Sequence, residues 1–164
     1  LTYADAKGEV VPSFPKALHF VSKTHWEWAV SPSPKDRGSF RASDFQPVHR
    51  EGLLERIDST GGPREILPDV WVEEVGGHTP GMWFVRVGRG EGAVVFGADL
   101  FPTRFHLKAN WNMAYDNEPL QSVQEKEAFA ERIHQEAWVL VLEHDPEVPA
   151  VRLTDIKGGF QSVT

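Results

Sequence analysis

Short runs dominated by apolar residues recur along the chain, and several alternate with polar positions in the way typical of β-strands. Glycine and proline residues separate the runs and predict turns between them. The expected strands cover residues 17–22, 69–75, 82–88, 92–97, 138–143 and 150–156. Together with the helices that the other segments indicate, these runs predict an α/β (α+β) fold.

The clearest helical period lies in residues 119–137. Leu120, Val123, Phe129 and Ile133 recur there at near-helical spacing, with charged residues between them. This spacing predicts a helix with one apolar face and one charged face.

Capping signals predict two shorter helices in the first third of the chain. Thr24 is the expected N-cap of a helix through residues 25–30. Ser43 with Gln46 fits a capping box that opens a helix through residues 49–57.

Bulk composition narrows the class of protein. With 164 residues, 40% of them hydrophobic and 25% charged, the chain is expected to form a single globular domain over residues 1–164. A net charge of -7 argues against a nucleic-acid partner, and no apolar run approaches the roughly 20 residues that span a membrane. The absence of cysteine excludes disulfides, thiolate metal ligands and a cysteine nucleophile. We expect a cytoplasmic protein.

Three predicted strands are each followed by a side chain that can ligate a metal. His78 follows the strand at 69–75, Asp99 follows the strand at 92–97, and His144 follows the strand at 138–143. Because sites gather where strands end, we expect the three side chains to converge in space. Two imidazoles and a carboxylate suit zinc, iron or manganese. Taken singly, each residue also fits a simpler reading as a turn or capping residue.

Four segments in this order resemble the second half of a metallo-β-lactamase-fold hydrolase: GGHTPGMWFVRV, VVFGADLFPT, NWNMAYDNEP and VLEHDPEVP. The resemblance implies an αββα sandwich, here mainly its C-terminal half. It also implies that His78 and His144 each bind one of two divalent metal ions and that Asp99 bridges them. Zinc is the expected metal, with manganese and iron left open.

The opening segment LTYADAKGEVVPSFP reads as a loop and resembles the part of this family that follows an H-x-H-x-D-H metal motif. No H-x-H occurs in the chain. We therefore expect a missing N-terminal segment or a companion chain to complete the ligand set, because a metal site needs its full ligand count. A homodimer is also compatible with the sequence.

The resemblance implies metal-dependent hydrolysis, in which a metal-bound hydroxide attacks an ester, a lactone or a related carbonyl of a small-molecule substrate. Two other readings stay open. One is a mono-iron enzyme similar to persulfide dioxygenases, and the other is a non-catalytic, truncated or structural half-domain.

Residues 101–119 lack a clear period and are rich in aromatic residues, which often marks a functional segment. This segment is most similar to that of lactonase-like and organophosphate-hydrolase-like members of the superfamily. The resemblance implies that His106 and Trp111 lie near the substrate pocket of the family, and one expected role of the Tyr115 hydroxyl is to donate to a substrate carbonyl or oxyanion. Loop packing is the alternative for the aromatic residues, and Asp116 is expected either to orient a neighbour or to cap the following helix.

Overall fold

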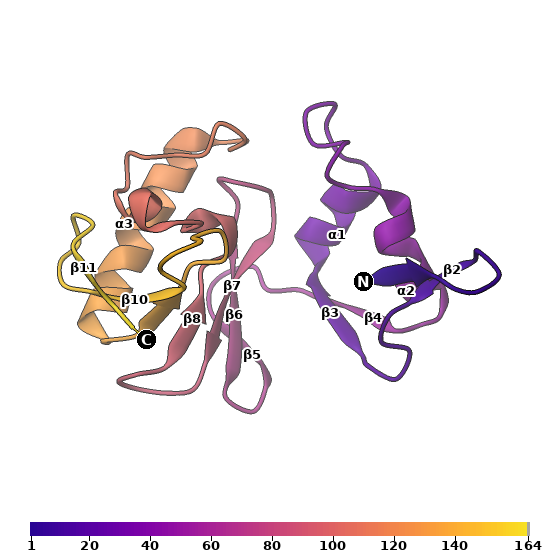
Figure 1. Ribbon diagram of the computed structural model, residues 1–164, viewed down its shortest axis with the longest axis horizontal. Helices are drawn as coiled ribbons and strands as arrows, with labels where there is room; N and C mark the ends of the chain where they lie inside the picture. Colours follow the sequence, from indigo (N-terminus) through magenta and orange to yellow (C-terminus); the bar gives the residue numbers. More distant parts are fainter. Residues whose placement is uncertain (164) are drawn as a thin grey trace. The chain divides into compact units, whose positions relative to one another are not determined.

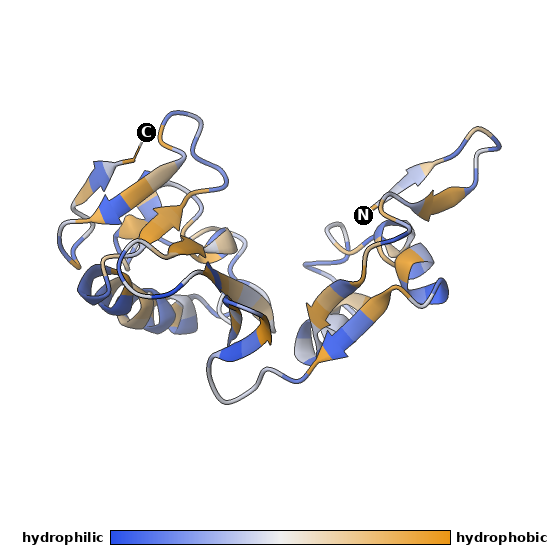
Figure 2. Cartoon of the chain, turned by 90° about the horizontal axis from the view of Figure 1, so that it is seen from below, coloured by the Kyte–Doolittle hydropathy of each residue, from blue (hydrophilic) through white to orange (hydrophobic). Residues whose placement is uncertain are grey.

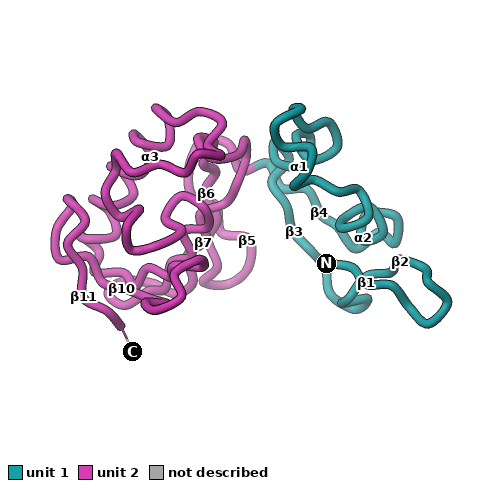
Figure 3. The backbone as a smooth tube through the Cα atoms, turned by 45° about the horizontal axis from the view of Figure 1, so that its top comes forward, with its two compact units in different colours: residues 1–58 teal, residues 59–164 magenta. Residues whose placement is uncertain are grey.

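A computed structural model describes residues 1–163. The chain divides into two compact units, Leu1–Asp58 and Ser59–Thr164, which are coloured separately in Figure 3. A division into compact units does not test whether the chain is one domain, so the single domain over residues 1–164 stays a prediction. Among the described residues, none of the helices has the length and apolar character needed to span a lipid bilayer.

The second unit is built on a seven-stranded sheet with the order β11-β10-β9-β8-β7-β6-β5 (Figure 1). All neighbouring strands in it are antiparallel except β8 and β9, which are parallel. The strands are β5 (Arg64–Leu67), β6 (Val70–Val75), β7 (Met82–Val87), β8 (Val94–Phe96), β9 (Val139–Val141), β10 (Ala150–Leu153) and β11 (Phe160–Ser162). Five of them confirm predicted strands, whereas β5 and β11 were not predicted.

Helix α3 (Pro119–Gln135) packs across one face of this sheet. Phe129 stacks on Phe84 of β7 with ring centroids 4.1 Å apart, and Ile133 is fully buried. Figure 2 shows apolar strands inside the unit and a hydrophilic outer face on this helix. The helix was predicted, but its apolar face begins later than expected, because Leu120 is 80% exposed. The buried side chains are Ser122, Lys126, Phe129, Ala130 and Ile133.

The first unit contains two small sheets. The opening segment forms an antiparallel hairpin of β1 (Thr2–Ala4) and β2 (Val10–Pro12), so the prediction of a loop there was wrong. A second sheet pairs β3 (His19–Ser22) in parallel with β4 (Leu54–Ile57).

Helix α1 (Lys23–Val30) follows β3 directly, as predicted. Its N-cap is Ser22 rather than Thr24, because the Ser22 hydroxyl accepts the backbone N–H of His25 at 2.9 Å.

The helix expected through residues 49–57 is wrong in extent. Helix α2 spans only Gln46–Arg50, and Gly52 adopts φ 70°, a conformation that stops a helix and favours glycine. The following residues then form β4, whose pairing with β3 satisfies backbone groups that a helix would otherwise have paired internally.

Candidate metal centre

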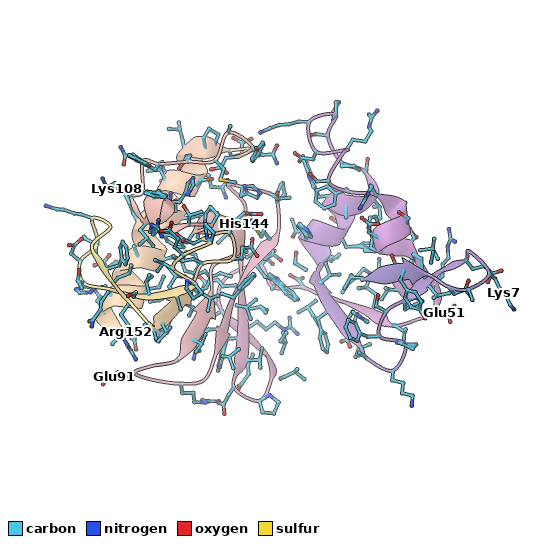
Figure 4. All side chains as sticks on the ribbon, viewed as in Figure 1. Lys7, Glu51, Glu91, Lys108, His144 and Arg152 are labelled. Carbon is cyan, nitrogen blue, oxygen red and sulfur yellow. The ribbon has the colours of Figure 1, made fainter. Side chains whose placement is uncertain are left out.

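Strand direction explains how the three candidate ligands meet. Strand β7 is antiparallel to both β6 and β8, so β6 and β8 run the same way, and β9 is parallel to β8. The carboxyl ends of all three strands therefore lie at one edge of the sheet. His78 follows β6, Asp99 follows β8, and His144 follows β9; His144 is labelled at this edge in Figure 4.

The carboxylate of Asp99 lies between the two imidazoles. Its Oδ2 is 3.3 Å from Nε2 of His78, and its Oδ1 is 3.1 Å from Nε2 of His144. The side chain of His78 is 14% exposed, whereas that of His144 is 58% exposed. The structure thus brings the three predicted residues together, with one side of the cluster buried and the other open.

The charges of this cluster support one another. Burial acts to lower the pKa of His78, but its hydrogen bonds with Asp99 and Asp116 outweigh that effect and raise it. The hydrogen bond with His78 lowers the pKa of Asp99 despite the opposing effect of burial. A positive charge is therefore favoured next to this carboxylate, which is the electrostatic condition that a metal cation also requires.

Asp116 orients the ring of His78. Its Oδ1 lies 2.9 Å from His78 Nδ1, and its side chain is only 5% exposed. This contact directs Nε2 of the imidazole toward Asp99, as carboxylates do behind metal-binding histidines. Glu118, not Asp116, is the N-cap residue of α3, so the orienting role agrees with the structure better than the capping role.

The turn that carries His78 is fixed by α3. The Glu125 carboxylate accepts the backbone N–H groups of Gly76 at 2.7 Å and Gly77 at 3.0 Å. A Cβ on Gly77 would lie 2.3 Å from the backbone nitrogen of Ser122, so only glycine fits this close approach. Gly77 therefore permits the close approach of the helix to the turn.

Asp99 lies in a tight 3₁₀ turn, Ala98–Leu100, directly after β8. Ala98 has φ 45°, which is unusual for a residue with a side chain. Leu100 and Phe101 are buried in the core and hold the turn in place. The carboxylate is thus presented by a short segment that is anchored from below.

Asp145 fixes the loop that carries His144. Its buried carboxylate accepts the backbone N–H groups of Arg104, Glu147 and Val148 and also pairs with the Arg104 guanidinium at 3.1 Å. The backbone N–H of His144 donates to the Pro102 carbonyl at 2.9 Å. Residues after β8 and after β9 are therefore tied to each other beside the cluster.

The donor set fits a divalent metal. Two ligands held about 2.0–2.1 Å from a tetrahedral ion lie about 3.3 Å apart, and the two imidazole–carboxylate distances, 3.3 and 3.1 Å, are close to that value. Ligand atoms of Asp99, Glu143 and His144 all lie within 4.8 Å of one another. The assignment of His78, Asp99 and His144 as metal ligands stays a prediction that this geometry supports.

No protein-family model matches the chain, and no curated protein matches it. Solved structures do. A probable metal-dependent hydrolase from Staphylococcus aureus matches with a TM-score of 0.79 and 23% identity, over 91% of this chain and 52% of that one. The hydrolase AbOPH of the beta-lactamase superfamily matches with a TM-score of 0.72 and 15% identity, over 92% and 55%. AidC, a dizinc quorum-quenching lactonase, matches with a TM-score of 0.67 and 17% identity, over 98% and 58%.

This chain has the metallo-β-lactamase-like fold. The structural similarity confirms the fold predicted from the sequence. Because the identities are below 25%, the similarity establishes the fold alone. The chain spans only 52% to 58% of the length of these structures, in agreement with a partial domain.

Glu143 also lies at the candidate metal centre, and the sequence analysis did not predict it. Its carboxylate lies 3.4 Å from His144 Nε2, and burial together with the charge of Asp99 raises its pKa. The only signal for it in the sequence is its place directly before His144.

The other residues predicted for the site lie on the segment before α3. Trp111 is 48% exposed and Tyr115 is 67% exposed, so neither is part of the core. Nδ1 of His106 lies 2.8 Å from the Thr103 hydroxyl, and burial lowers the pKa of His106. The substrate roles of these three residues stay predictions.

Lys126 fixes this segment from below. The residue is 2% exposed, and its ammonium group donates to the carbonyls of Lys108 at 3.0 Å and Trp111 at 2.5 Å. Burial lowers its pKa to about 8, against the opposing charge of Asp116. A charged lysine on the buried face of α3 therefore ties the metallo-β-lactamase-like core to the segment that carries Trp111 and Tyr115.

This burial predicts a pH dependence of stability. Because the pKa of folded Lys126 is about 8 and that of an unfolded lysine is higher, the unfolded chain binds more protons above pH 8. The free energy of unfolding should therefore rise between about pH 8 and pH 10 by about 1–3 kcal/mol relative to a Lys126→Met variant. Denaturant unfolding at several pH values measures this difference. Lys157→Met, at an exposed lysine, is the control, and an equal pH dependence of wild type and Lys126→Met would contradict the prediction.

Proposed function

We propose that this chain carries half of the metal centre of a metal-dependent hydrolase that acts on an ester, a lactone or a related carbonyl compound. The observation that carries the proposal is the contact of each Asp99 oxygen with a different imidazole. A carboxylate in this position can bridge two ions, with His78 binding one and His144 binding the other. The metallo-β-lactamase-like fold of the chain supports the same reading.

Each residue has a distinct part in this proposal. When bound, the metal ions polarise the substrate carbonyl and activate water. Asp116 holds the His78 ring in the tautomer that leaves Nε2 free for the ion. Asp145 keeps His144 next to Asp99 by fixing the loop after β9. Zinc is the metal we propose, since the donors are nitrogen and oxygen atoms, and manganese or iron fit the same donors.

The substrate side of the site is proposed to be the segment that Lys126 supports. Trp111 and Tyr115 are both exposed there, so they are available to a small molecule. We propose that the Trp111 ring contacts the apolar part of the substrate and that the Tyr115 hydroxyl donates to the developing oxyanion. AidC is a lactonase solved with a product, N-hexanoyl-L-homoserine, which makes acyl lactones the first substrates to test.

The centre needs ligands from outside this chain. His78 and Asp99 offer two ligands to one ion, which is fewer than the three protein ligands of catalytic zinc sites, and Glu143 is a third donor on the side of His144 and Asp99. We propose that a further segment or companion chain supplies the others, which also accords with the 52% of the matched hydrolase that this chain spans. Metal binding by residues 1–164 alone should therefore be weak.

The test combines metal analysis with a panel of substrates. The chain is purified alone and within the longer polypeptide or complex that supplies the other ligands, and bound metal is quantified after dialysis against zinc, manganese or ferrous iron. Lactones, aryl esters, thioesters and phosphotriesters are then assayed. We expect two ions for each completed centre, hydrolysis of an ester or lactone, and little metal or activity in residues 1–164 alone.

Two results would overturn the proposal. One bound iron with oxidation of a persulfide and no hydrolysis would assign a dioxygenase. A completed protein that binds no metal would favour a structural half-domain. Glu127→Ala, a carboxylate removed from the exposed face of α3, is the control for nonspecific changes in metal content.

A further inference from the structure

Three arginines and three aromatic rings alternate on the α3 side of the seven-stranded sheet. Trp71 on β6 lies opposite Arg86 on β7, and these side chains share the sheet face with Glu73 and Phe84. We call the whole series the arginine–aromatic stack; in order it contains Arg89, Trp71, Arg86, Trp138, Arg132 and Phe129.

The spacing in this stack is close throughout. The Arg86 guanidinium carbon is 5.1 Å from the Trp71 ring and 5.3 Å from the Trp138 ring. The Arg132 guanidinium carbon is 5.6 Å from the Trp138 ring and 4.6 Å from the Phe129 ring. Each of these distances is within the range of cation–π attraction, so the stack holds two guanidinium groups among apolar walls.

A cavity of about 130 Å³ opens within the arginine–aromatic stack. Water occupies about 30 Å³ per molecule in the liquid, so this space accommodates a few waters or one small organic ion. The side chains that line it come from β6, β7 and α3 and from the residues just before β5 and β9: Pro63, Trp71, Val72, Glu73, Phe84, Arg86, Arg132 and Trp138. None of them belongs to the candidate metal centre.

Donor groups without acceptors gather around this cavity. Among the described residues, five buried side-chain polar atoms have no hydrogen-bond partner, and three of the five belong to residues that line it. They are the indole N–H groups of Trp71 and Trp138 and the Nε–H of Arg132. Buried donors are normally paired, so three unpaired donors on residues that line one cavity make this cavity a candidate binding site for an acceptor.

Within residues 1–163, no side chain or carbonyl accepts from these three donors. The Glu73 carboxylate already pairs with the Arg132 Nη2 at 2.6 Å, and the Arg86 Nη1 donates to the Gly88 carbonyl. Two guanidinium groups against one carboxylate leave a net positive charge at the cavity. The missing acceptor is therefore expected to be an anion, because a neutral ligand would leave that charge uncompensated.

We propose that this cavity binds a small organic carboxylate with a short apolar tail. The carboxylate accepts from the Arg132 Nε–H and the two indole N–H groups, and the tail lies against the aromatic walls. These nitrogens are covered in the free protein, so binding requires small side-chain rotations. Stacking permits them, because cation–π attraction requires a guanidinium over the ring face but no single in-plane orientation. The cavity size favours an acid of about two to four carbons.

The indole N–H signals of the six tryptophans provide a direct test by ¹H–¹⁵N NMR. Propionate is titrated into the ¹⁵N-labelled chain, with propionamide as the neutral analogue and inorganic phosphate as the alternative anion. Trp28 and Trp83 are internal controls, because their indole N–H groups already donate to Asp36 and Ser59 at 2.8 Å. We expect saturable shifts of the Trp71 and Trp138 signals with propionate and none of comparable size for the controls.

Variants then assign the donors. Trp71→Phe keeps an aromatic ring and removes one N–H, so propionate affinity should fall by about tenfold. Trp83→Phe is the matched control and should leave that affinity unchanged. Arg132→Lys, which keeps the charge and loses the Nε–H, provides an independent second variant if Trp71→Phe does not fold. Absence of saturable shifts, or equal shifts with propionamide or phosphate, would overturn the proposal.

Discussion

Asp99→Ala is expected to remove both metal ions from the completed centre and to lower its rate of ester or lactone hydrolysis by on the order of a thousandfold. The reason is that Asp99 contacts both imidazoles, through separate oxygen atoms. Loss of the shared ligand affects both ions, and stabilisation of a transition state by metal ions contributes several kcal/mol. Metal content and turnover are measured on the same preparations.

A second variant separates the loss of a ligand from a loss of folding. Asp99→Asn keeps the shape of the side chain and one strong acceptor oxygen, so it should fold like wild type and retain at most one ion. Glu127→Ala should match wild type in both measurements. If Asp99→Ala kept full metal content and full turnover, the bridging role would be wrong.

Gly77→Ala is expected to destabilise the second unit by about 3 kcal/mol or more. The new Cβ would lie 2.3 Å from the backbone nitrogen of Ser122 and 2.4 Å from its hydroxyl oxygen. Backbone atoms of a helix cannot turn aside as the end of a side chain can, so α3 would have to move away from the turn. Denaturant unfolding measures the loss of stability, and metal binding should weaken in parallel because His78 follows directly.

The neighbouring glycine is the matched control. A Cβ on Gly76 would meet the Nε2 atom of Gln121 at 2.7 Å, which is the far end of a flexible side chain. Gly76→Ala should therefore lower the free energy of unfolding by less than about 1 kcal/mol, which is the contribution of one exposed hydrogen bond such as that from Gln121 to Glu125. Similar destabilisation by the two variants would show that the close approach of α3 is not what requires glycine at position 77.

Much of the second unit could be predicted from its sequence. Its apolar runs are separated by glycine and proline, so the strands are local features that pattern alone reveals. His78, Asp99 and His144 each follow such a run, and the shared direction of β6, β8 and β9 brings them to one edge. The sequence pattern shows where a strand ends. The relative directions of the strands depend on how the whole sheet is paired, so only the structure shows that these three strand ends lie together.

The partners of the supporting residues could not be predicted, because they are distant in sequence. Asp116 contacts His78 across 38 positions, and Glu125 contacts Gly77 across 48. Lys126 appeared to be one charge among many on an amphipathic helix, although it occupies the buried face three residues before Phe129. A charged residue at a core position of a helix can be recognised in a sequence. The backbone carbonyls that it will bind cannot be predicted from the sequence.

In the first unit, a local sequence signal predicted the wrong secondary structure. Residues 54–57 belong to the segment that the capping box of Ser43 and Gln46 predicted to be a helix. The segment instead pairs with β3 along its length, from His19 opposite Leu54 to Ser22 opposite Ile57. Parallel pairing is a long-range interaction that outweighs local helix propensity, and no pattern within the segment reports it.

The sharing of Asp99 by two imidazoles has a consequence for how the proposed centre responds to metal supply. The first ion to bind fixes the carboxylate, so the second ion no longer has to order it, and this advantage is reciprocal between the two positions. Half-filled centres should then be scarce at every concentration of free metal. Occupancy would change over a narrow range of metal concentration, and a shortage that removes one ion would release its neighbour as well.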